Sequence, residues 1–339
     1  MGNIIKKYML NKLIKKICKN DVIQVISPSG TLNLKSDVFK IAEDNFQELF
    51  GVKIEYSRNS GKPDLYGSSS LKKRLDDLHN TFKNKKVKGI ICLTGGYNAN
   101  DLLKYIDWKI IKNNPKPIIG SSDITVLINS IYSKTGLISY FGPNYFKFGM
   151  EIGLNYTLDY FKKCLICNDE YIISSSKDWS SDKWYRDQKN RNFYKNKGMV
   201  TINEGGAKGV LIGGNLCSLN LLQGTEFMPS LKNSILLIED DDLAGEDCFG
   251  EFNRNLQSLL HLPEARFIKG VLLGRFQPNS KMDIKKIKYI INSKKELKNI
   301  PVIADVDFGH TDPMLTLPIG GTVEMIAKKG KPVIKVINH

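Results

Sequence analysis

The stretch that decides the fold class is Pro-Lys-Pro-Ile-Ile-Gly-Ser-Ser-Asp-Ile-Thr-Val-Leu-Ile-Asn-Ser-Ile-Tyr-Ser-Lys-Thr-Gly, residues 115–136 of a chain of 339. A short apolar run ends at Gly120, and apolar residues at helical spacing then continue as far as Gly136. Ser122 lies at the turn from the predicted strand to the predicted helix. A serine on such a turn can be an exposed nucleophile with the helix N-terminus behind it. Ser122 and its polar neighbours are also common helix N-cap residues, so the local pattern leaves both interpretations open.

The segments before this stretch alternate between strand and helix patterns. Such a βαβα series predicts a doubly wound parallel sheet, in which sites form at the carboxyl ends of the strands. Gly95, Gly96 and Ser122 all fall at such ends. The predicted strands cover 22–27, 52–56 and 87–93, and the predicted helices cover 36–50, 70–82 and a segment from about residue 100.

The remaining chain divides into three further parts. Residues 168–207 are polar, aromatic and aperiodic, which predicts a linker or a loop over a site. A second unit, 208–339, has apolar runs, two helical segments near 215–223 and 249–260, and a terminal hairpin pattern. We therefore expect a basic amphipathic, helix-forming arm (1–20), an N-terminal domain (21–167), the linker or substrate loop (168–207) and a C-terminal domain (208–339).

The charge of the chain is strongly positive but unevenly spread. Lysine and arginine number 50 against 35 acidic residues, a net charge of +15, and residues 1–20 hold six lysines and no acid. Aromatic residues do not alternate with arginine as in a single-strand binding groove, so nucleic-acid binding is not expected. We expect the arm to pack on the protein or to move rather than to anchor it in a membrane. No apolar run approaches about 18 residues and no secretory signal is evident, which predicts a cytoplasmic protein.

The cysteines do not indicate a metal site. Six are scattered along the chain, and the one C-x-x-C pair, Cys164 and Cys167, lacks a second pair or nearby histidines. Buried free thiols are expected for most of them, including Cys92 and Cys217, which lie in apolar runs. We expect neither a metal nor a cofactor.

A serine nucleophile needs a base, and the base needs an acid that orients it. Of the four histidines, His310 is the best placed, because it lies in a turn-rich segment after an apolar run, although a lone loop histidine is more often structural. Glu239 ends the apolar run 234–238, where loops commonly hold functional groups. The alternative for Glu239 is a surface acidic cluster in which residues 240–242 hold a divalent ion. Consecutive acids on a strand point to alternating sides, which disfavours a cage built from them alone.

Six motifs in order along the chain resemble those of the LD-carboxypeptidases and the microcin C immunity peptidases, which are serine peptidases with a Ser-Glu-His triad. The resemblance implies a flavodoxin-like N-terminal domain, a smaller β-rich C-terminal domain and a homodimer. It implies that Ser122 is the nucleophile, Glu239 the orienting acid and His310 the base. It places the oxyanion hole at the backbone N–H groups of Gly96 and Asp123. The motifs are Leu93-Thr-Gly-Gly-Tyr-Asn, Gly120-Ser-Ser-Asp-Ile-Thr, Gly136-Leu-Ile-Ser-Tyr-Phe-Gly-Pro, Gly213-Gly-Asn-Leu-Cys-Ser-Leu, Leu237-Ile-Glu-Asp and Gly309-His-Thr-Asp-Pro-Met.

The substrate depends on the branch of this family. The segment with Trp179 and Trp184 is similar to the microcin C immunity branch, in which an aromatic loop stacks on a nucleobase. By the same resemblance, Tyr97 and Asn215 are expected to contact substrate. The expected substrate is a small peptidyl or aminoacyl nucleotide, cut at the amide that joins a peptide or acidic amino acid to the nucleotide-like part.

Three other functions remain open at this point. An LD-carboxypeptidase would release the terminal D-amino acid of a murein tetrapeptide. A flavodoxin-like module could bind a ligand without catalysis, and a basic protein could bind nucleic acid.

Overall fold

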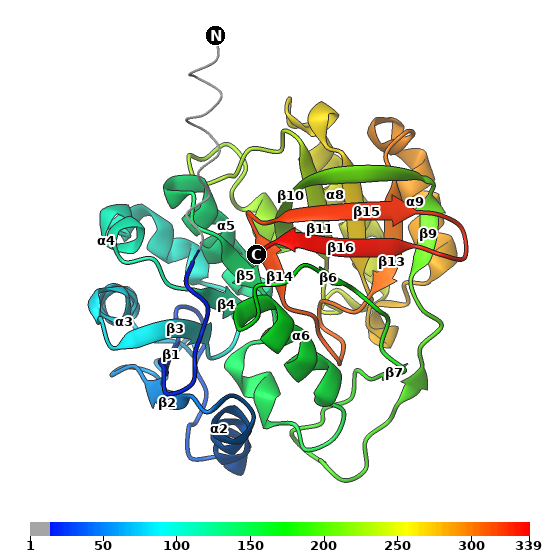
Figure 1. Ribbon diagram of the computed structural model, residues 1–339. Coiled ribbons are helices and arrows are strands. Elements are labelled where there is room, and N and C mark those ends of the chain that lie inside the picture. Colours follow the sequence, from blue (N-terminus) through cyan, green and yellow to red (C-terminus); the bar gives the residue numbers. More distant parts are fainter. Residues whose placement is uncertain (1–13) are drawn as a thin grey trace.

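The computed structural model describes residues 14–339, which fold around two β-sheets placed next to each other (Figure 1). The first sheet has the strand order β14-β5-β4-β3-β1-β2, and the second has the order β6-β16-β15-β10-β11-β12-β13-β9. The strands of the first sheet are β1 (Val22–Ile26), β2 (Lys53–Tyr56), β3 (Val87–Cys92), β4 (Ile118–Gly120), β5 (Ser139–Phe141) and β14 (Leu317–Ile319). The strands of the second sheet are β6 (Tyr171–Ile172), β9 (Val200–Asn203), β10 (Gly205–Asn215), β11 (Ser234–Glu239), β12 (Gly270–Gly274), β13 (Val302–Val306), β15 (Thr322–Ala327) and β16 (Val333–Asn338).

Helices connect and cover these strands. The α-helices are α2 (Asp37–Phe50), α3 (Leu71–Lys83), α4 (Trp108–Asn113), α5 (Thr125–Thr135), α6 (Asn155–Leu165), α7 (Leu216–Asn220), α8 (Cys248–Leu260) and α9 (Ile284–Ser293). The short 3₁₀ helices are η2 (Ala99–Tyr105), η3 (Ser122–Ile124), η4 (Tyr145–Gly149), η5 (Gly245–Asp247), η6 (Ala265–Phe267), η7 (Pro278–Ser280) and η8 (Lys295–Leu297).

The first sheet confirms the predicted fold class. Strands β1 to β5 are all parallel and run in the order 2-1-3-4-5, which is the flavodoxin-like order. Helix α5 ends where the sequence predicts, because Gly136 adopts the left-handed φ of 73° that terminates helices without a Cβ penalty. Helix α2 begins as predicted, with the Ser36 hydroxyl accepting a hydrogen bond from the Val38 N–H.

The second sheet is the β-rich region. Strands β10, β11, β12 and β13 are parallel, and antiparallel strands flank them on both sides, including the predicted terminal hairpin of β15 and β16. Two of its strands, β6 and β9, come from the segment 168–207, so part of the expected linker belongs to this sheet. Conversely, strand β14, from the C-terminal part of the chain, belongs to the first sheet, where it pairs antiparallel with β5. This strand ties the C-terminal part of the chain to the N-terminal sheet.

The beginning of the described chain differs from the expected amphipathic helix. Residues 14–20 have no helical structure, whereas residues 1–13 of the predicted arm lie outside the described residues. Ile14 and Ile17 are buried in the core, and the Lys16 ammonium donates hydrogen bonds to the carbonyl oxygens of Cys164 and His339, both at 2.8 Å. The helical prediction is wrong for residues 14–20, because tertiary contacts hold this short segment in an irregular conformation that ends in a turn at residues 19 and 20.

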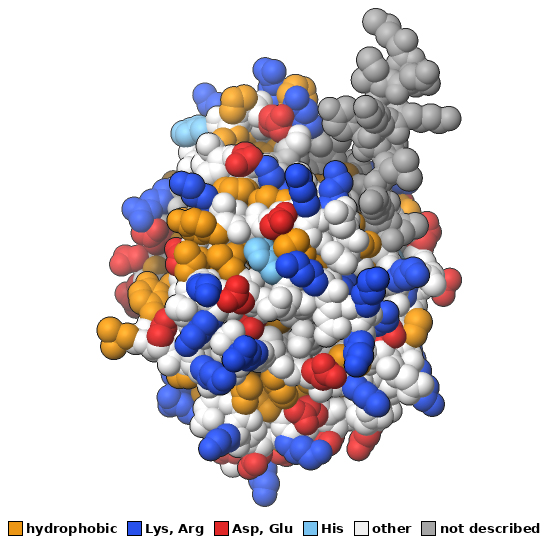
Figure 2. All heavy atoms as spheres, turned by 90° about the vertical axis from the view of Figure 1, so that its left-hand side faces the viewer, with side chains coloured by type: hydrophobic (Ala, Val, Ile, Leu, Met, Phe, Trp, Pro, Cys, Tyr) orange, Lys and Arg blue, Asp and Glu red, His pale blue; other side chains and the backbone are white. Residues whose placement is uncertain are grey.

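The surface charge and the cysteine thiols can also be compared with what the sequence predicts. On the face shown in Figure 2, basic side chains are spread over the surface among acidic ones and do not gather in one patch. Within residues 14–339 no helix is long and apolar enough to span a membrane. All six cysteines are free; Cys92, Cys164 and Cys248 are buried, but Cys217 is exposed, contrary to expectation.

Candidate active site

The backbone around Ser122 holds its hydroxyl at the carboxyl edge of the first sheet. Strand β4 ends at Gly120, and Ser122 opens the short helix η3 with a φ of 62°, a left-handed value that few residues other than glycine adopt. Such strain is typical of a nucleophile on a sharp strand-to-helix turn. Gly95, from the neighbouring strand end, packs so closely that a Cβ there would lie 2.9 Å from the Ser122 Cβ. A glycine is therefore required beside this serine.

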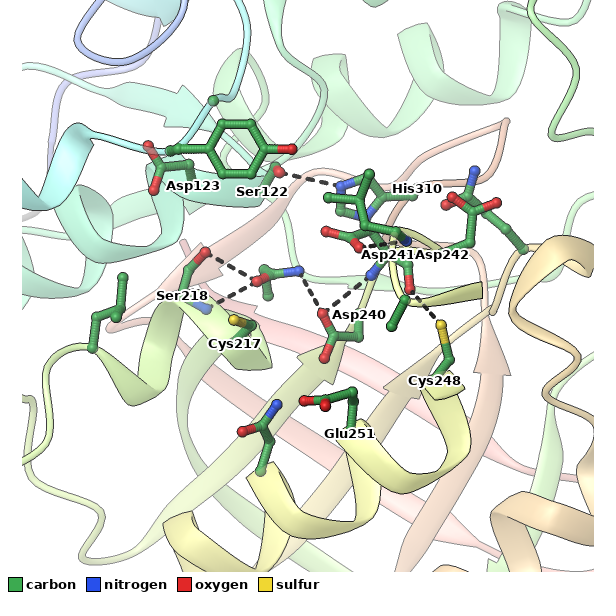
Figure 3. A pocket seen from close by; sticks show the side chains of 18 residues that line it. Ser122, Asp123, Cys217, Ser218, Asp240, Asp241, Asp242, Cys248, Glu251 and His310 are labelled. Carbon is green, nitrogen blue, oxygen red and sulfur yellow. Dashed lines mark hydrogen bonds between the residues drawn. The ribbon is translucent and has the colours of Figure 1, made fainter. Parts of the chain in front are cut away.

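The structure brings Ser122, His310 and Glu239 into one hydrogen-bonded line. Figure 3 shows the part of this line that joins Ser122 and His310. The His310 Nε2 atom is 3.2 Å from the Ser122 Oγ, and the His310 Nδ1 atom is 2.7 Å from the Glu239 Oε2. Glu239 is the last residue of β11 and is 1 % exposed, and His310 lies in the loop after β13. Gly309 has a φ of 108°, and a Cβ there would lie 2.8 Å from the Glu239 carboxylate. The line has the spacing of a nucleophile, its base and an orienting acid.

The Glu239 carboxylate sets the protonation behaviour of His310. Burial alone would lower the pKa of His310, because desolvation disfavours the charged imidazolium. The charge of Glu239 and its hydrogen bond, with a smaller contribution from Asp241, outweigh burial and raise the pKa of His310 above its ordinary value of 6.5. A base with a raised pKa accepts a proton readily and must be neutral before it can act.

Two backbone N–H groups near Ser122, those of Gly96 and Asp123, are available to bind a further acceptor. Neither the N–H of Gly96 nor that of Asp123 donates a hydrogen bond to an acceptor within residues 14–339. The Asp123 carboxylate is turned away and accepts hydrogen bonds from the Ser29 hydroxyl at 2.5 Å and the Ala99 N–H at 2.8 Å. Gly96 has a φ of 154°, and a Cβ there would collide with Ser29. These contacts hold both N–H groups in place before any substrate arrives.

The larger of two cavities at Ser122 has a volume of about 480 Å³ and is lined by Ser122 and His310 themselves. Tyr97 and Asn215, the two expected substrate contacts, both line it. The Tyr97 side chain is 70 % exposed at the rim, whereas Asn215 is 2 % exposed. The Asn215 Oδ1 accepts from Ser218, and its Nδ2 donates to the Asp240 Oδ1 at 3.1 Å. Asn215 therefore holds the wall of the cavity in shape.

The acids that follow Glu239 also line this cavity. Because β11 ends at Glu239, Asp240, Asp241 and Asp242 lie in a loop that curves along the cavity wall (Figure 3). The sequence alternative of a surface acidic cluster overlooked this placement. Within the described part of the chain, no group of three or more histidine, cysteine or acidic side chains has the geometry to hold a metal ion.

A smaller cavity of about 230 Å³ also borders Ser122 and His310, but the rest of its lining is mostly different. It is lined by Phe146 and Lys147 as well as by Ser122 and His310. The Lys147 ammonium donates a hydrogen bond of 2.6 Å to the carboxylate of Asp312, which follows His310 closely in the chain. Sequence reasoning missed Phe146 and Lys147, because they follow the motif 136–143 within a segment that carries no recognisable spacing.

Neither predicted tryptophan lines these two cavities. Trp184 is 4 % exposed and packs against the Phe146 ring at a centroid distance of 4.7 Å. Trp179 stacks on Tyr194 at 4.7 Å, and Tyr194 lines a third cavity that Asp242 shares. Each tryptophan therefore packs against another aromatic ring, and that ring, rather than the tryptophan, lines a cavity. The spacing of aromatic residues in the sequence does not show which ring lines the cavity.

The aromatic segment is attached to the loop that carries His310. Strand β7 (Asp178–Trp179) pairs with β8 (Tyr194–Lys195), which closes the segment between them into a loop. The backbones of Ser180 and Asp312 exchange two hydrogen bonds, of 2.7 and 2.8 Å. The predicted loop therefore reaches the site through the segment of His310.

Comparison with known proteins gives a consistent family assignment. The LD-carboxypeptidase N-terminal domain matches residues 23–142, and the LD-carboxypeptidase C-terminal domain matches residues 208–325. "Putative carboxypeptidase YocD" of Bacillus subtilis is 44% identical over 324 residues, covering 96% of this chain and 99% of its own. The crystal structure of an MccF-like protein from Bacillus anthracis superposes with a TM-score of 0.95 at 45% identity, covering 96% of this chain and 99% of its own.

A third relative has solved structures with bound ligands. The microcin C7 self-immunity protein MccF of Escherichia coli is 32% identical over 324 residues, covering 91% of each chain. Structures of microcin C7 self-immunity protein MccF with aspartyl sulfamoyl adenosine and of MccF with glutamyl sulfamoyl guanosine superpose with TM-scores of 0.83 and 0.84, at 28% identity, each covering 96% of this chain and 98% of its own.

Proposed function

The chain belongs to the LD-carboxypeptidase family of serine peptidases, and on that premise we propose that Ser122, His310 and Glu239 are its catalytic triad. The single observation that carries the proposal is the line of hydrogen bonds from Ser122 through His310 to Glu239 at the wall of a cavity. The strained backbone of Ser122 and the free N–H groups of Gly96 and Asp123 support it.

The geometry suits acyl transfer in two steps. The Ser122 Oγ attacks the carbonyl carbon of the scissile amide while the His310 Nε2 accepts the hydroxyl proton. The N–H groups of Gly96 and Asp123 stabilise the oxyanion, and His310 then gives its proton to the leaving nitrogen as the C–N bond breaks. Water, deprotonated by His310, hydrolyses the acyl ester and restores the serine. Glu239 keeps the Nδ1 proton of His310 in place throughout.

The proposed substrate is an amide that joins a peptide or an amino acid to a nucleotide-like group. Two features support this substrate: similarity to MccF, which binds aminoacyl sulfamoyl nucleosides, and the smaller cavity, which is lined by the aromatic Phe146 and by Lys147, whose ammonium also pairs with Asp312. An aromatic face can stack on a base, and an ammonium attracts a sulfamate or phosphate. Cleavage of such an amide would detoxify an antibiotic of the microcin C type.

A second candidate is release of the terminal D-amino acid from a murein tetrapeptide, which the name of one relative, "Murein tetrapeptide carboxypeptidase", supports. The observation that favours it is again Lys147, because an ammonium beside the nucleophile can hold the terminal carboxylate that a carboxypeptidase must recognise. The homodimer and the cytoplasmic location expected from the sequence stay predictions.

The two candidates separate in one comparison of kcat/KM. The substrates are norleucyl sulfamoyl adenosine, whose acyl side chain is neutral, and an LD-linked murein tetrapeptide. We expect the nucleoside to be cleaved with the higher kcat/KM, and Ser122→Ala to abolish that activity. A strong preference for the murein peptide would favour the second candidate over the first. If neither substrate is cleaved, both candidate functions are wrong.

A further inference from the structure

The charge of the larger cavity is one-sided. Five of its lining residues are acidic, and none is lysine or arginine. The Asp123 carboxylate is turned into the protein, and Glu251 is paired with Arg254 at 2.5 Å. Asp240, Asp241 and Asp242 remain, and none of them has an ion-pair partner within residues 14–339. The cavity beside the nucleophile therefore carries an excess of negative charge.

Contacts within the wall fix the first two of these carboxylates in place. The Asp240 Oδ1 accepts from the Asn215 amide at 3.1 Å and from the Asp241 N–H at 3.2 Å. The Asp241 Oδ1 accepts from the Leu243 N–H at 2.9 Å. Burial, together with the charges of Glu239 and Asp241, raises the pKa of Asp240 to about 7. Such mutual repulsion is relieved when a cation enters the cavity.

The smaller cavity at Ser122 differs in character from the larger one, which orients the substrate. Its lining includes the Phe146 ring and Lys147, whose ammonium is paired with Asp312 at 2.6 Å, but no acidic side chain, and the proposed leaving group carries both an anion and an aromatic base. That leaving group would be repelled by Asp240–Asp242 and is accommodated beside Lys147. The acyl residue is then left for the larger cavity.

We propose that the larger cavity selects acyl residues whose side chain carries an ammonium or a guanidinium, and that the carboxylates of Asp241 and Asp242 are the specificity determinants. This inference rests on the proposed function, since it concerns the acyl side of the same scissile amide. It replaces the acidic amino acid expected from the sequence with a basic one. The preference would be opposite to that suggested by the aspartyl and glutamyl ligands in the MccF structures.

The test is a matched series of aminoacyl sulfamoyl adenosines with lysyl, arginyl, norleucyl and glutamyl side chains. All four share the α-ammonium and the leaving group, so their kcat/KM ratios isolate the side-chain charge. We expect lysyl and arginyl compounds to exceed norleucyl by about tenfold or more, and glutamyl to be the poorest. The same comparison with lysyl-D-alanine and norleucyl-D-alanine peptides covers the second candidate function.

Variants then locate the effect. Asp241→Asn and Asp242→Asn should each lower the lysyl-to-norleucyl ratio, and the double variant should bring it close to one. Asp247→Asn is the matched control, because Asp247 follows the same loop but does not line the cavity, and its ratio should equal that of the wild type.

Each outcome decides a different point. Cleavage of the norleucyl compounds without preference for the basic ones, or a preference that survives the double variant, overturns the inference and leaves the proposed function standing. If no compound of either series is cleaved, the proposed function is wrong and the inference falls with it.

Discussion

The two sheets position the three proposed catalytic groups in different ways. The first sheet positions Ser122 through local features, namely the end of β4 and the left-handed backbone of the serine itself. The second sheet positions Glu239 at the end of β11 and His310 after β13, 71 residues apart in sequence. Ser122 and His310 are 188 residues apart. The nucleophile is thus a local structure, whereas its alignment with the base depends on how the sheets pack.

Long-range contacts maintain that alignment. Strand β14 follows the His310 loop and pairs with β5, and Lys147 reaches across to Asp312 at 2.6 Å. The backbone pair of Ser180 and Asp312 adds a third attachment. Substitutions near Ser122 should therefore alter the rate of catalysis without altering the stability of the fold. Substitutions in the segments that position His310 should also alter the pH dependence of activity or the free energy of unfolding.

The largest effect is expected from removing the nucleophile or the base. Ser122→Ala and His310→Ala should each lower kcat by about 10³-fold or more, leaving the contributions of substrate binding and the oxyanion hole. Steady-state kinetics on the preferred substrate measures the loss, and circular dichroism and thermal melting check that each variant is folded. Near-normal turnover by folded Ser122→Ala would remove Ser122 from the mechanism.

The next effect separates the acid from the base. Glu239→Gln should reduce kcat by a similar or smaller factor than His310→Ala, because the base remains but loses its orienting carboxylate. Since that carboxylate raises the pKa of His310, its neutralisation should lower this pKa. His310 acts when neutral, so wild-type activity should fall as the pH drops through the raised pKa, and this acidic limb should move to lower pH in the variant. A full pH profile of kcat/KM checks both points, and an unmoved limb would argue against the pairing.

A glycine tests the local side of the comparison. Gly95→Ala introduces a Cβ 2.9 Å from the Ser122 Cβ, which must displace the nucleophile or the oxyanion turn. A displacement of about 1 Å can cost about 10²-fold in rate, and we expect a loss of that order in kcat. Gly250→Ala is the control, because its Cβ would meet no atom within 4 Å. Equal activity of the two variants would contradict the close approach.

The smallest effect on turnover is expected from the tryptophans. Trp184→Ala should lower the free energy of unfolding by about 3–5 kcal/mol, since it empties a buried site behind Phe146. It should raise KM more than it lowers kcat, because Trp184 supports the Phe146 ring, and stacking of that ring on a base would contribute similarly to the ground and transition states. Trp184→Phe should restore much of both, and Trp179→Ala should destabilise less because its ring is only half-buried. Urea unfolding measures the change in stability, and Michaelis–Menten kinetics measures the change in KM. An unchanged KM in Trp184→Ala would show that this ring does not contribute to substrate binding.

The sequence predicted those parts of the molecule that depend on short-range patterns. The parallel strands, helix α5 with its terminal Gly136 and the carboxylate at the end of β11 all follow from apolar periodicity and turn residues. The proposed catalytic roles of Ser122, Glu239 and His310 depended on the resemblance to a family, because a lone loop histidine carries little information by itself.

The features that sequence reasoning missed depend on tertiary contacts. Strand β14 has three residues, including Pro318, and carries no periodic signal. The irregular conformation of residues 14–20 depends on the buried Ile14 and Ile17, although the apolar spacing favours a helix. The acids after Glu239 fit a surface cluster on sequence grounds, whereas they line the larger cavity in the structure. The sequence alone does not show whether the loop after a strand faces a cavity or the solvent.

Covalent labelling tests the central claim most directly. The wild-type enzyme is treated with a fluorophosphonate, and peptide mass spectrometry locates the adduct. A serine activated by a neighbouring base reacts with such a reagent, so we expect a single adduct on Ser122, slower labelling in His310→Ala and no labelling of Ser122→Ala. An adduct on another residue, or equal labelling of Ser122→Ala, would contradict the assignment of Ser122 as the nucleophile.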